Sequence, residues 1–219
     1  MGYTHYWYRD REIARKPFAK IVDDFKKLLP ILKVLDVKLG DAGGEGSPVI
    51  NYDEVVFNGL RNCGHPKNPH IAIPWPAPVV KPGVAPSQSG AVVGTWFAGV
   101  ILNQRTCDGD CSYETFYFPR VLPESYRPLE PIFGYDMFGR PIYRDKRFVG
   151  KYFGSCKTAF RPYDLAVTAF LVIAKHHLGD SLIVTSDGTI AHWMDAMRLC
   201  NNVLGYGLDF RLDDDSEAL

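Results

Sequence analysis

The chain has 219 residues, of which 46% are hydrophobic and 23% are charged, so it can form a globular core and is not a disordered chain. Its 25 Lys and Arg residues balance 25 Asp and Glu residues, so no overall charge draws it to nucleic acid or to an anionic membrane. The 5 cysteines are an odd number, which argues against a secreted disulfide framework and leaves reduced thiols or metal ligands.

The N-terminus has no apolar segment of the kind found in signal peptides. The longest apolar run, residues 165–174, is about half of the roughly 20 residues that span a bilayer. We therefore expect a cytoplasmic protein with no membrane partner and no strong nucleic-acid partner.

The first third of the chain predicts a strand, a helix and a second strand. Residues 3–8 (YTHYWY) are aromatic and β-prone. A helix follows, because apolar residues recur at helical spacing between a proline in the first turn and a proline that weakens the end. These apolar residues are Phe18, Ile21, Val22, Phe25, Leu28, Leu29 and Leu32, and the prolines are Pro17 and Pro30. Residues 40–48 predict a glycine-rich turn without the lysine of a phosphate loop, and residues 49–59 predict a strand.

The middle of the chain is interrupted by two proline-rich segments. Residues 61–95 predict a long irregular excursion, because proline cannot donate to a strand ladder or continue a helix. Strands are expected over residues 92–102 and 113–118. Regular structure should lapse again over residues 119–146.

The last third predicts a β-α-β-α unit, with a strand near residues 147–153, a helix over 162–178, a strand over 181–186 and a helix from 189 to 204. Two strands joined by such a helix are parallel, and their connection is right-handed, if both lie in one sheet. We predict one α+β domain over residues 1–212, with a mixed β-sheet, about three helices and two proline-rich excursions. The acidic tail, residues 213–219, should be disordered.

Polar residues from two loops are expected to meet at one end of this unit. Ligands of open α/β sheets bind outside the carboxyl ends of the strands, and helix N-termini together with basic side chains favour an anion. We therefore expect an anionic small molecule, such as a nucleotide or a phosphate compound, to be bound here. The candidate ligand-binding residues are Lys157, Thr158, Arg161, Ser186, Asp187 and Trp193.

Each of these residues also has a simpler explanation. Asp187 or Ser186 can cap the last helix, Asp164 can complement a helix dipole, and Trp193 belongs to an apolar stripe that predicts core packing. Cys156 can be a small buried apolar residue. Both interpretations stay open.

Two further hypotheses concern function. In the first, the protein is a hydrolase or transferase in which Cys156 is the nucleophile and Asp187 and His192 are acid/base groups. Cys156 and His192 must then come within hydrogen-bond reach, or within one water of it, in a pocket. The pair His176 and His177 is a poorer partner, because the helix places it roughly 20 Å from its own first turn. In the second hypothesis, prolines and aromatic residues form the assembly surface of a virion or protein-interaction component.

Two short segments, NCGHPKNPH and TCDGDC, contain residues of the types that bind zinc. Cys63 and His65 lie in the first, and Cys107 and Cys111 in the second. Four such ligands suit a tetrahedral structural zinc ion, which would clip together a region poor in regular structure. The spacing matches no standard zinc finger, and the alternative is a set of surface thiols.

Five segments of the chain resemble a family of uncharacterised small proteins from bacteriophages and bacteria. The matching segments are GYTHYW, VVFNG, ETFYFPR, CKTAFRPYDLAVTAFLVIAKHH and TSDG. The resemblance implies a phage-type accessory protein in the cytoplasm of a bacterial host. It carries over no catalytic residue, because the family has no established activity. Residues 61–106 look like an insertion relative to this family, so the metal cluster would be particular to this branch.

Overall fold

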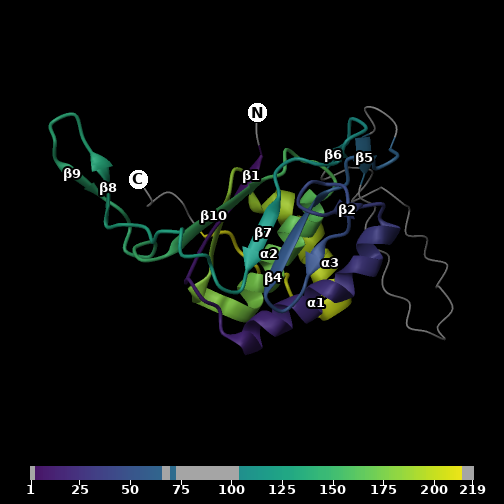
Figure 1. Cartoon of the computed structure of the whole chain (residues 1–219), viewed down its shortest axis with the longest axis horizontal. Coiled ribbons are helices and arrows are strands. Elements are labelled where there is room, and N and C mark those ends of the chain that lie inside the picture. Colours follow the sequence, from purple (N-terminus) through teal and green to yellow (C-terminus); the bar gives the residue numbers. More distant parts are fainter. Residues whose placement is uncertain (1–2, 66–69, 73–103, 214–219) are drawn as a thin grey trace.

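The structure, a computed structural model, describes residues 3–65, 70–72 and 104–213 (Figure 1). The chain begins with β1 (Thr4–Arg9), α1 (Arg15–Val34), β2 (Leu39–Gly40), β3 (Val49–Ile50), β4 (Glu54–Gly59), β5 (His70–Ala72), β6 (Gln104–Thr106) and β7 (Phe116–Pro119). It continues with β8 (Ile132–Tyr135), β9 (Pro141–Tyr143), β10 (Tyr152–Lys157), α2 (Asp164–Leu178), the 3-10 helix η1 (Gly179–Ser181), β11 (Ile183–Ser186) and α3 (Ile190–Leu204). The predicted α+β class and C-terminal β-α-β-α segment are confirmed.

The β-α-β unit is split by the first strand of the chain. The sheet has the order β10-β1-β11, and β1 pairs antiparallel with both neighbours. His5 stands opposite Cys156 on one side and opposite Ser186 on the other. The prediction of a mixed sheet was wrong for the described residues, which form several small antiparallel sheets. β10 and β11 do point the same way, but β1 lies between them, so they share no hydrogen bonds.

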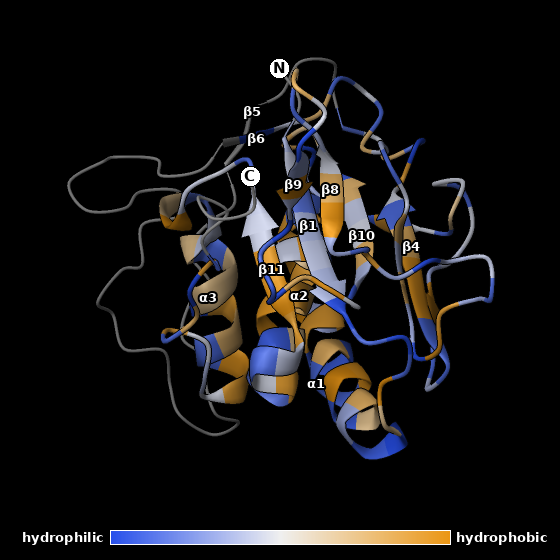
Figure 2. Ribbon diagram, turned by 90° about the vertical axis from the view of Figure 1, so that its left-hand side faces the viewer, coloured by the Kyte–Doolittle hydropathy of each residue, from blue (hydrophilic) through white to orange (hydrophobic). Residues whose placement is uncertain are grey.

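Three helices, α1, α2 and α3, lie side by side against the strands, with α2 in the middle (Figure 2). Residues 164–174 of α2 are all buried, as expected for a helix that packs against neighbours on every side. Helix α1 buries a single stripe, as its apolar spacing predicted, and it continues past Pro30 to Val34 although proline has no N–H to donate to the helix. A second sheet, in which β4 pairs with β2, β3 and β7, joins the same core through Phe57 and Phe116.

Short strands lie in both segments that were predicted to be irregular. β5, which lies within residues 61–95, pairs with β6 at residues 104–106. In residues 119–146, β8 pairs with β9, and this hairpin projects from the body (Figure 1). Proline fits this hairpin because Pro141 is the first residue of β9, where a missing N–H costs least. The strand predicted over residues 92–102 lies outside the described residues.

Two boundaries differ from the predictions. The strand expected near residues 147–153 is β10, which runs from Tyr152 to Lys157, so Cys156 and Lys157 lie in a strand and not in a loop. The first residue of the predicted disordered tail, Asp213, is anchored: its N–H donates to Val184 O at 2.9 Å, and its carboxylate pairs with Lys175 at 2.9 Å. Residues 214–219 lie outside the described part of the chain.

Candidate functional site

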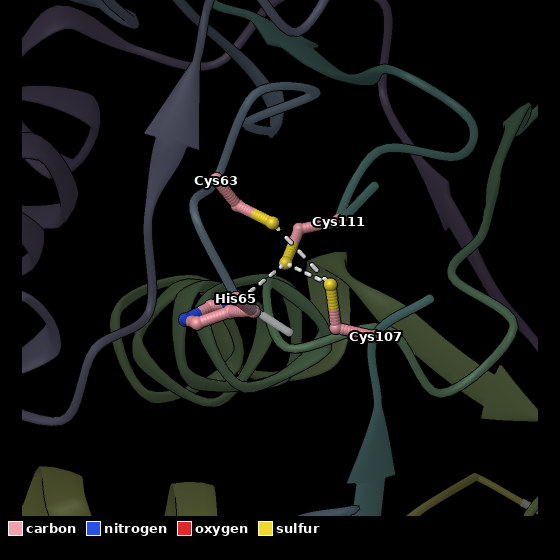
Figure 3. Close-up of side chains that lie close together, drawn as sticks. All are labelled: Cys63, His65, Cys107 and Cys111. Atoms are coloured by element: carbon pink, nitrogen blue, oxygen red, sulfur yellow. Dashed lines mark hydrogen bonds between the residues drawn. The ribbon is translucent and has the colours of Figure 1, made fainter. Parts of the chain in front are cut away.

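Three cysteines and a histidine point toward one another between two loops (Figure 3). Cys63 and His65 follow β4, while Cys107 and Cys111 follow β6. Their ligand atoms all lie within 4.8 Å of one another. Zn–S bonds of about 2.3 Å in a tetrahedron place sulfur atoms about 3.8 Å apart, so this spacing suits a zinc ion. The three thiols are free and buried, and the cluster can hold a metal ion such as zinc.

Each half of the cluster has a glycine that lets the chain turn back on its ligand. Gly64 (φ +74°) and Gly109 (φ +78°) have backbone angles that favour glycine. Burial opposes ionisation of Cys63, but the backbone N–H of His65 contributes to lowering its pKa. Burial raises the pKa of Cys107, and the N–H of Gly109 opposes this rise. Sulfur atoms that accept N–H groups in tight turns are well arranged as metal ligands.

The imidazole of His65 is held from its far side. Nδ1 lies 3.1 Å from Cys111 Sγ, inside the cluster, and Nε2 lies 2.8 Å from Asp36 Oδ2. A carboxylate in this position fixes the ring and its tautomer, as it does for many histidines that bind zinc. Lys38 donates to the Cys63 carbonyl and pairs with Asp36 at 3.2 Å, which ties the same loop down again.

A buried polar network lies at the end of the β10-β1-β11 sheet. Asp164, at the start of α2, accepts hydrogen bonds from His5 Nε2 at 2.7 Å, Thr158 Oγ1 at 2.6 Å and Arg105 Nε at 3.1 Å. Arg105 Nη1 also reaches Asp195 Oδ2 on α3, at 2.9 Å. We call these five residues the Asp164 network. It ties β1, β6, α2 and α3 together.

The charge of Asp164 depends on its partners. Burial raises its pKa, but the Arg105 guanidinium and then His5 outweigh burial and lower the pKa to about 2. Burial likewise opposes the charge of Arg105, while Asp164 and Asp195 raise its pKa. The fully buried pair is therefore ionised, and each partner depends on the other.

The loop after β11 meets this network through β1. Ser186 Oγ lies 3.1 Å from His5 Nδ1 and accepts the Gly188 N–H at 3.1 Å. Asp187 is exposed, and its carboxylate accepts the Thr4 N–H at 3.0 Å and the Tyr6 hydroxyl at 2.9 Å. The predicted meeting of loop residues at this end thus includes an N-terminal strand that the prediction left out.

Three of the proposed site residues are buried in the structure. Thr158 donates its hydroxyl hydrogen to Asp164 Oδ1 at 2.6 Å. Trp193 is fully buried, with its ring stacked on Phe210 at 5.0 Å and edge-on to His5 at 4.9 Å, so it packs in the core and is not free to stack on a base. Cys156 is also fully buried, with Sγ 3.5 Å from Glu114 O.

The Cys156 and His192 pairing of the hydrolase hypothesis does not form. Burial raises the pKa of the Cys156 thiol, which disfavours a thiolate. His192 is engaged elsewhere, because its Nδ1 accepts the Thr189 N–H at 3.0 Å in the cap of α3. Cys156 is therefore a structural thiol and not an accessible nucleophile.

Lys157 and Arg161 flank a strained loop. Ala159 (φ +50°) and Phe160 (φ +55°) both adopt left-handed angles, which cost non-glycine residues energy and are concentrated at functional sites. Phe160 is held by stacking on Tyr3, with ring centroids 3.7 Å apart. Lys157 Nζ lies 5.7 Å from the Tyr113 ring centroid. Arg161 is half-buried, and its side chain has no hydrogen-bond or ion-pair partner among the residues described.

The histidine pair at the end of α2 has packing partners. His177 Nε2 lies 2.7 Å from Asp24 Oδ2, and His176 stacks on Tyr206 with ring centroids 3.6 Å apart. Burial, and then the neighbouring His177, lower the pKa of His176. These contacts join α2 to α1 and to the turn after α3.

Comparisons with protein-family models, with curated proteins and with solved structures each found no match. Within residues 3–65, 70–72 and 104–213, the helices lack the combined length and apolarity that a bilayer crossing requires.

Proposed function

We propose that this protein binds one zinc ion through Cys63, His65, Cys107 and Cys111, and that the ion has a structural role. The observation that carries this proposal is the convergence of four ligand atoms within 4.8 Å. A site with four protein ligands leaves no open position for water or substrate, which is the arrangement of structural zinc. The zinc would join the loop after β4 to the loop after β6.

The position of Arg105 gives this zinc a consequence for the rest of the fold. Arg105 lies two residues before Cys107, in a strand of three residues that pairs with β5 within the described chain. A sheet made of two such short strands is marginally stable by itself. Fixing Cys107 would hold Arg105 against Asp164 and Asp195, so the metal would support the buried network from outside it.

Metal content and thermal unfolding test the proposal. We expect about one zinc per chain by elemental analysis, and none in Cys107→Ser. Chelation should lower Tm by about 10 °C or more, since several kcal/mol of binding energy is lost and each is worth about 2–4 °C in a chain of this size. Cys200→Ser is the matched control, because Cys200 is a buried free thiol outside the cluster. Purified protein that contains no metal, and whose Tm does not change when chelator is added, would reject the proposal.

A second candidate function is the binding of an anionic small molecule, a nucleotide or phosphate compound, at Lys157 and Arg161. The strained turn between these two cations favours it, as does an Arg161 side chain without a partner in the described part of the chain. Saturating inorganic pyrophosphate or ATP should raise Tm, and Arg161→Gln should remove the rise. Ligand at about 100 times Kd is worth about 2.7 kcal/mol, so a flat response at millimolar concentrations would contradict it.

A third candidate is a role as an assembly component, which the projecting β8–β9 hairpin favours. Met137 and Phe138 at its tip are 90% and 74% exposed. Apolar groups exposed on a projecting element are typical of protein interaction sites. The cytoplasmic, phage-type setting remains an expectation from the sequence resemblance.

A further inference from the structure

We propose that Ser186 is a catalytic nucleophile for acyl transfer from a carboxylic ester, with His5 as its general base and Asp164 as the group that orients His5. This goes beyond zinc binding, because none of the three residues belongs to the metal cluster. It also differs from the hydrolase hypothesis of the sequence analysis, because it uses none of Cys156, Asp187 and His192.

The hydrogen bonds give His5 the tautomer that a base needs. The ionised Asp164 carboxylate can only accept, so His5 Nε2, 2.7 Å away, carries the proton of that hydrogen bond. The lone pair of neutral His5 is then on Nδ1. Ser186 Oγ lies 3.1 Å from this atom, within the reach required for proton transfer. The Ser186 hydroxyl has two acceptors within reach, His5 Nδ1 at 3.1 Å and the Thr4 carbonyl at 3.4 Å, and the shorter contact positions His5 to take its proton.

The surroundings hold the base rigid. Arg105 and Thr158 occupy the Asp164 carboxylate, which leaves it no freedom to turn away from His5. The His5 ring is clasped edge-on by Tyr3 and Trp193, with centroids 4.8 Å and 4.9 Å away. A base whose rotamer is locked by packing loses no entropy when it reacts.

Ser186 is more exposed than its two partners. It is the last residue of β11 and is half-buried, while His5 and Asp164 are fully buried. The chain turns at Gly188, which must be glycine because a Cβ there would stand 2.5 Å from the Tyr3 ring. The nucleophile is thus partly exposed, while its base is shielded from water.

The other hydroxyl and thiol groups near this base are committed elsewhere. Thr158 donates to Asp164, and Cys156 is buried against Glu114 O. The hydrogen bond from Gly188 N to Ser186 Oγ fits a turn-capping serine as well as a positioned nucleophile. Chemical reactivity separates these two roles, because a capping serine has the reactivity of an ordinary alcohol.

The reaction balances without any further reactant except water. Ser186 Oγ bonds to the ester carbonyl carbon as its proton passes to His5 Nδ1. The carbon–oxygen bond to the alcohol then breaks, and the alcohol leaves with the proton from His5. Water attacks the acyl group on Ser186, gives a proton to His5 and releases the carboxylic acid, and that proton returns to Ser186 Oγ.

A fluorophosphonate, which forms a covalent bond with activated serines, tests the proposal on the full chain. We expect one adduct per folded chain, mapped to Ser186 by peptide mass spectrometry and absent from Ser186→Ala. Ser155 on β10 is exposed and serves as the matched site, so Ser155→Ala should label like the unaltered protein. Base activation is worth about 10²–10⁴-fold, so Ser186 should react at least about 100-fold faster than Ser155.

Two further measurements complete the test. Protein unfolded in urea before labelling should form no adduct, and 4-nitrophenyl acetate should give a burst of about one nitrophenolate per folded chain that Ser186→Ala lacks. Absence of an adduct at Ser186 in folded protein would overturn the proposal, as would equal labelling of Ser186 and Ser155. Zinc content and ligand-induced Tm shifts are measured separately, so a failure here leaves those two proposals standing.

Discussion

His5 Nε2 lies 2.7 Å from Asp164 Oδ1, although the two residues stand 159 positions apart in the chain. Both side chains are fully buried. The contact joins the central strand of the β10-β1-β11 sheet to the first turn of the central helix. Because Arg105 and Thr158 meet the same carboxylate, elements from the start, middle and end of the chain depend on one acidic residue.

Substitution of Asp164 should therefore be among the most destabilising changes in the protein. Asp164→Asn removes the charge that balances buried Arg105, and breaking a buried ion pair costs about 3–5 kcal/mol. Urea unfolding at pH 7 measures the loss. The control is Asp53→Asn, an exposed position where we expect a change below about 0.5 kcal/mol. Equal unfolding midpoints for the two variants would show that the network contributes no stability.

The same residue predicts how stability depends on pH. The pKa of Asp164 is lowered from 3.8 to about 2 in the folded protein, so the folded state favours the ionised form. Its contribution, about 2 kcal/mol, is present above about pH 5 and is lost as pH falls toward about pH 2, with about 1 kcal/mol gone by pH 3.

A pairwise comparison isolates this effect from acid release of a metal. A metal ion held by the Cys63, His65, Cys107 and Cys111 cluster would be released by protonation of its ligands in every variant, so only the difference between the unaltered protein and Asp164→Asn reports on Asp164. We expect the difference in unfolding free energy to shrink by about 1 kcal/mol between pH 6 and pH 3. Parallel curves over this range would mean that Asp164 has an ordinary pKa in the fold.

The sequence predicted local structure well, because local structure has local causes. The apolar stripe predicted for α1 is the buried face of that helix, and the continuous apolar run of α2 gave nearly correct bounds for it. The metal cluster was also predicted, since its residue types are distinctive wherever they occur. The hairpin β8–β9 was missed because proline content was taken to exclude strands, whereas Pro141 stands at a strand start.

The buried network could not be predicted, because it is made by pairing between distant segments. Nothing near His5 in the chain shows that β1 enters between β10 and β11. Asp164 was noticed only as a charge at a helix start, and Arg105, which follows the strand predicted over residues 92–102, was not among the candidate site residues. Ser186 and Asp187 contact His5 and Thr4 of β1, which the prediction left out, and burial removes Cys156 and Trp193 from the predicted site.

Gly59, the last residue of β4, lies directly against the loop that carries Cys111. A Cβ at this position would overlap the carbonyl of Cys111, so the close approach of the two loops requires glycine. Gly59→Ala should push the Cys111 loop away, costing about 2–3 kcal/mol and reducing zinc content after dialysis. Gly134→Ala on β8 is the control, because a Cβ there meets nothing within 4 Å. Full zinc retention in Gly59→Ala would show that the loop can move without losing its ligand.

The projecting β8–β9 hairpin should contribute to binding and not to the stability of the body. Its tip is ordered by Asp136, whose carboxylate accepts the N–H groups of Phe138 and Arg140 at 2.8 Å and 2.9 Å. This turn keeps the apolar side chains of Met137 and Phe138 exposed to solvent. A rigid turn that exposes apolar side chains loses little entropy when a partner covers them.

The double substitution Met137→Ser with Phe138→Ser tests this division. We expect Tm to stay within about 2 °C, because these side chains are mostly exposed and bury little area in the monomer. Light scattering over a concentration series would show whether the tip mediates self-association, which the double variant should abolish. The matched change Tyr52→Ser alters an aromatic residue that is 53% exposed on the body, and it should leave association unchanged. A large drop in Tm for the tip variant would instead mean that the hairpin supports the fold, and that its apolar residues are not a free binding surface.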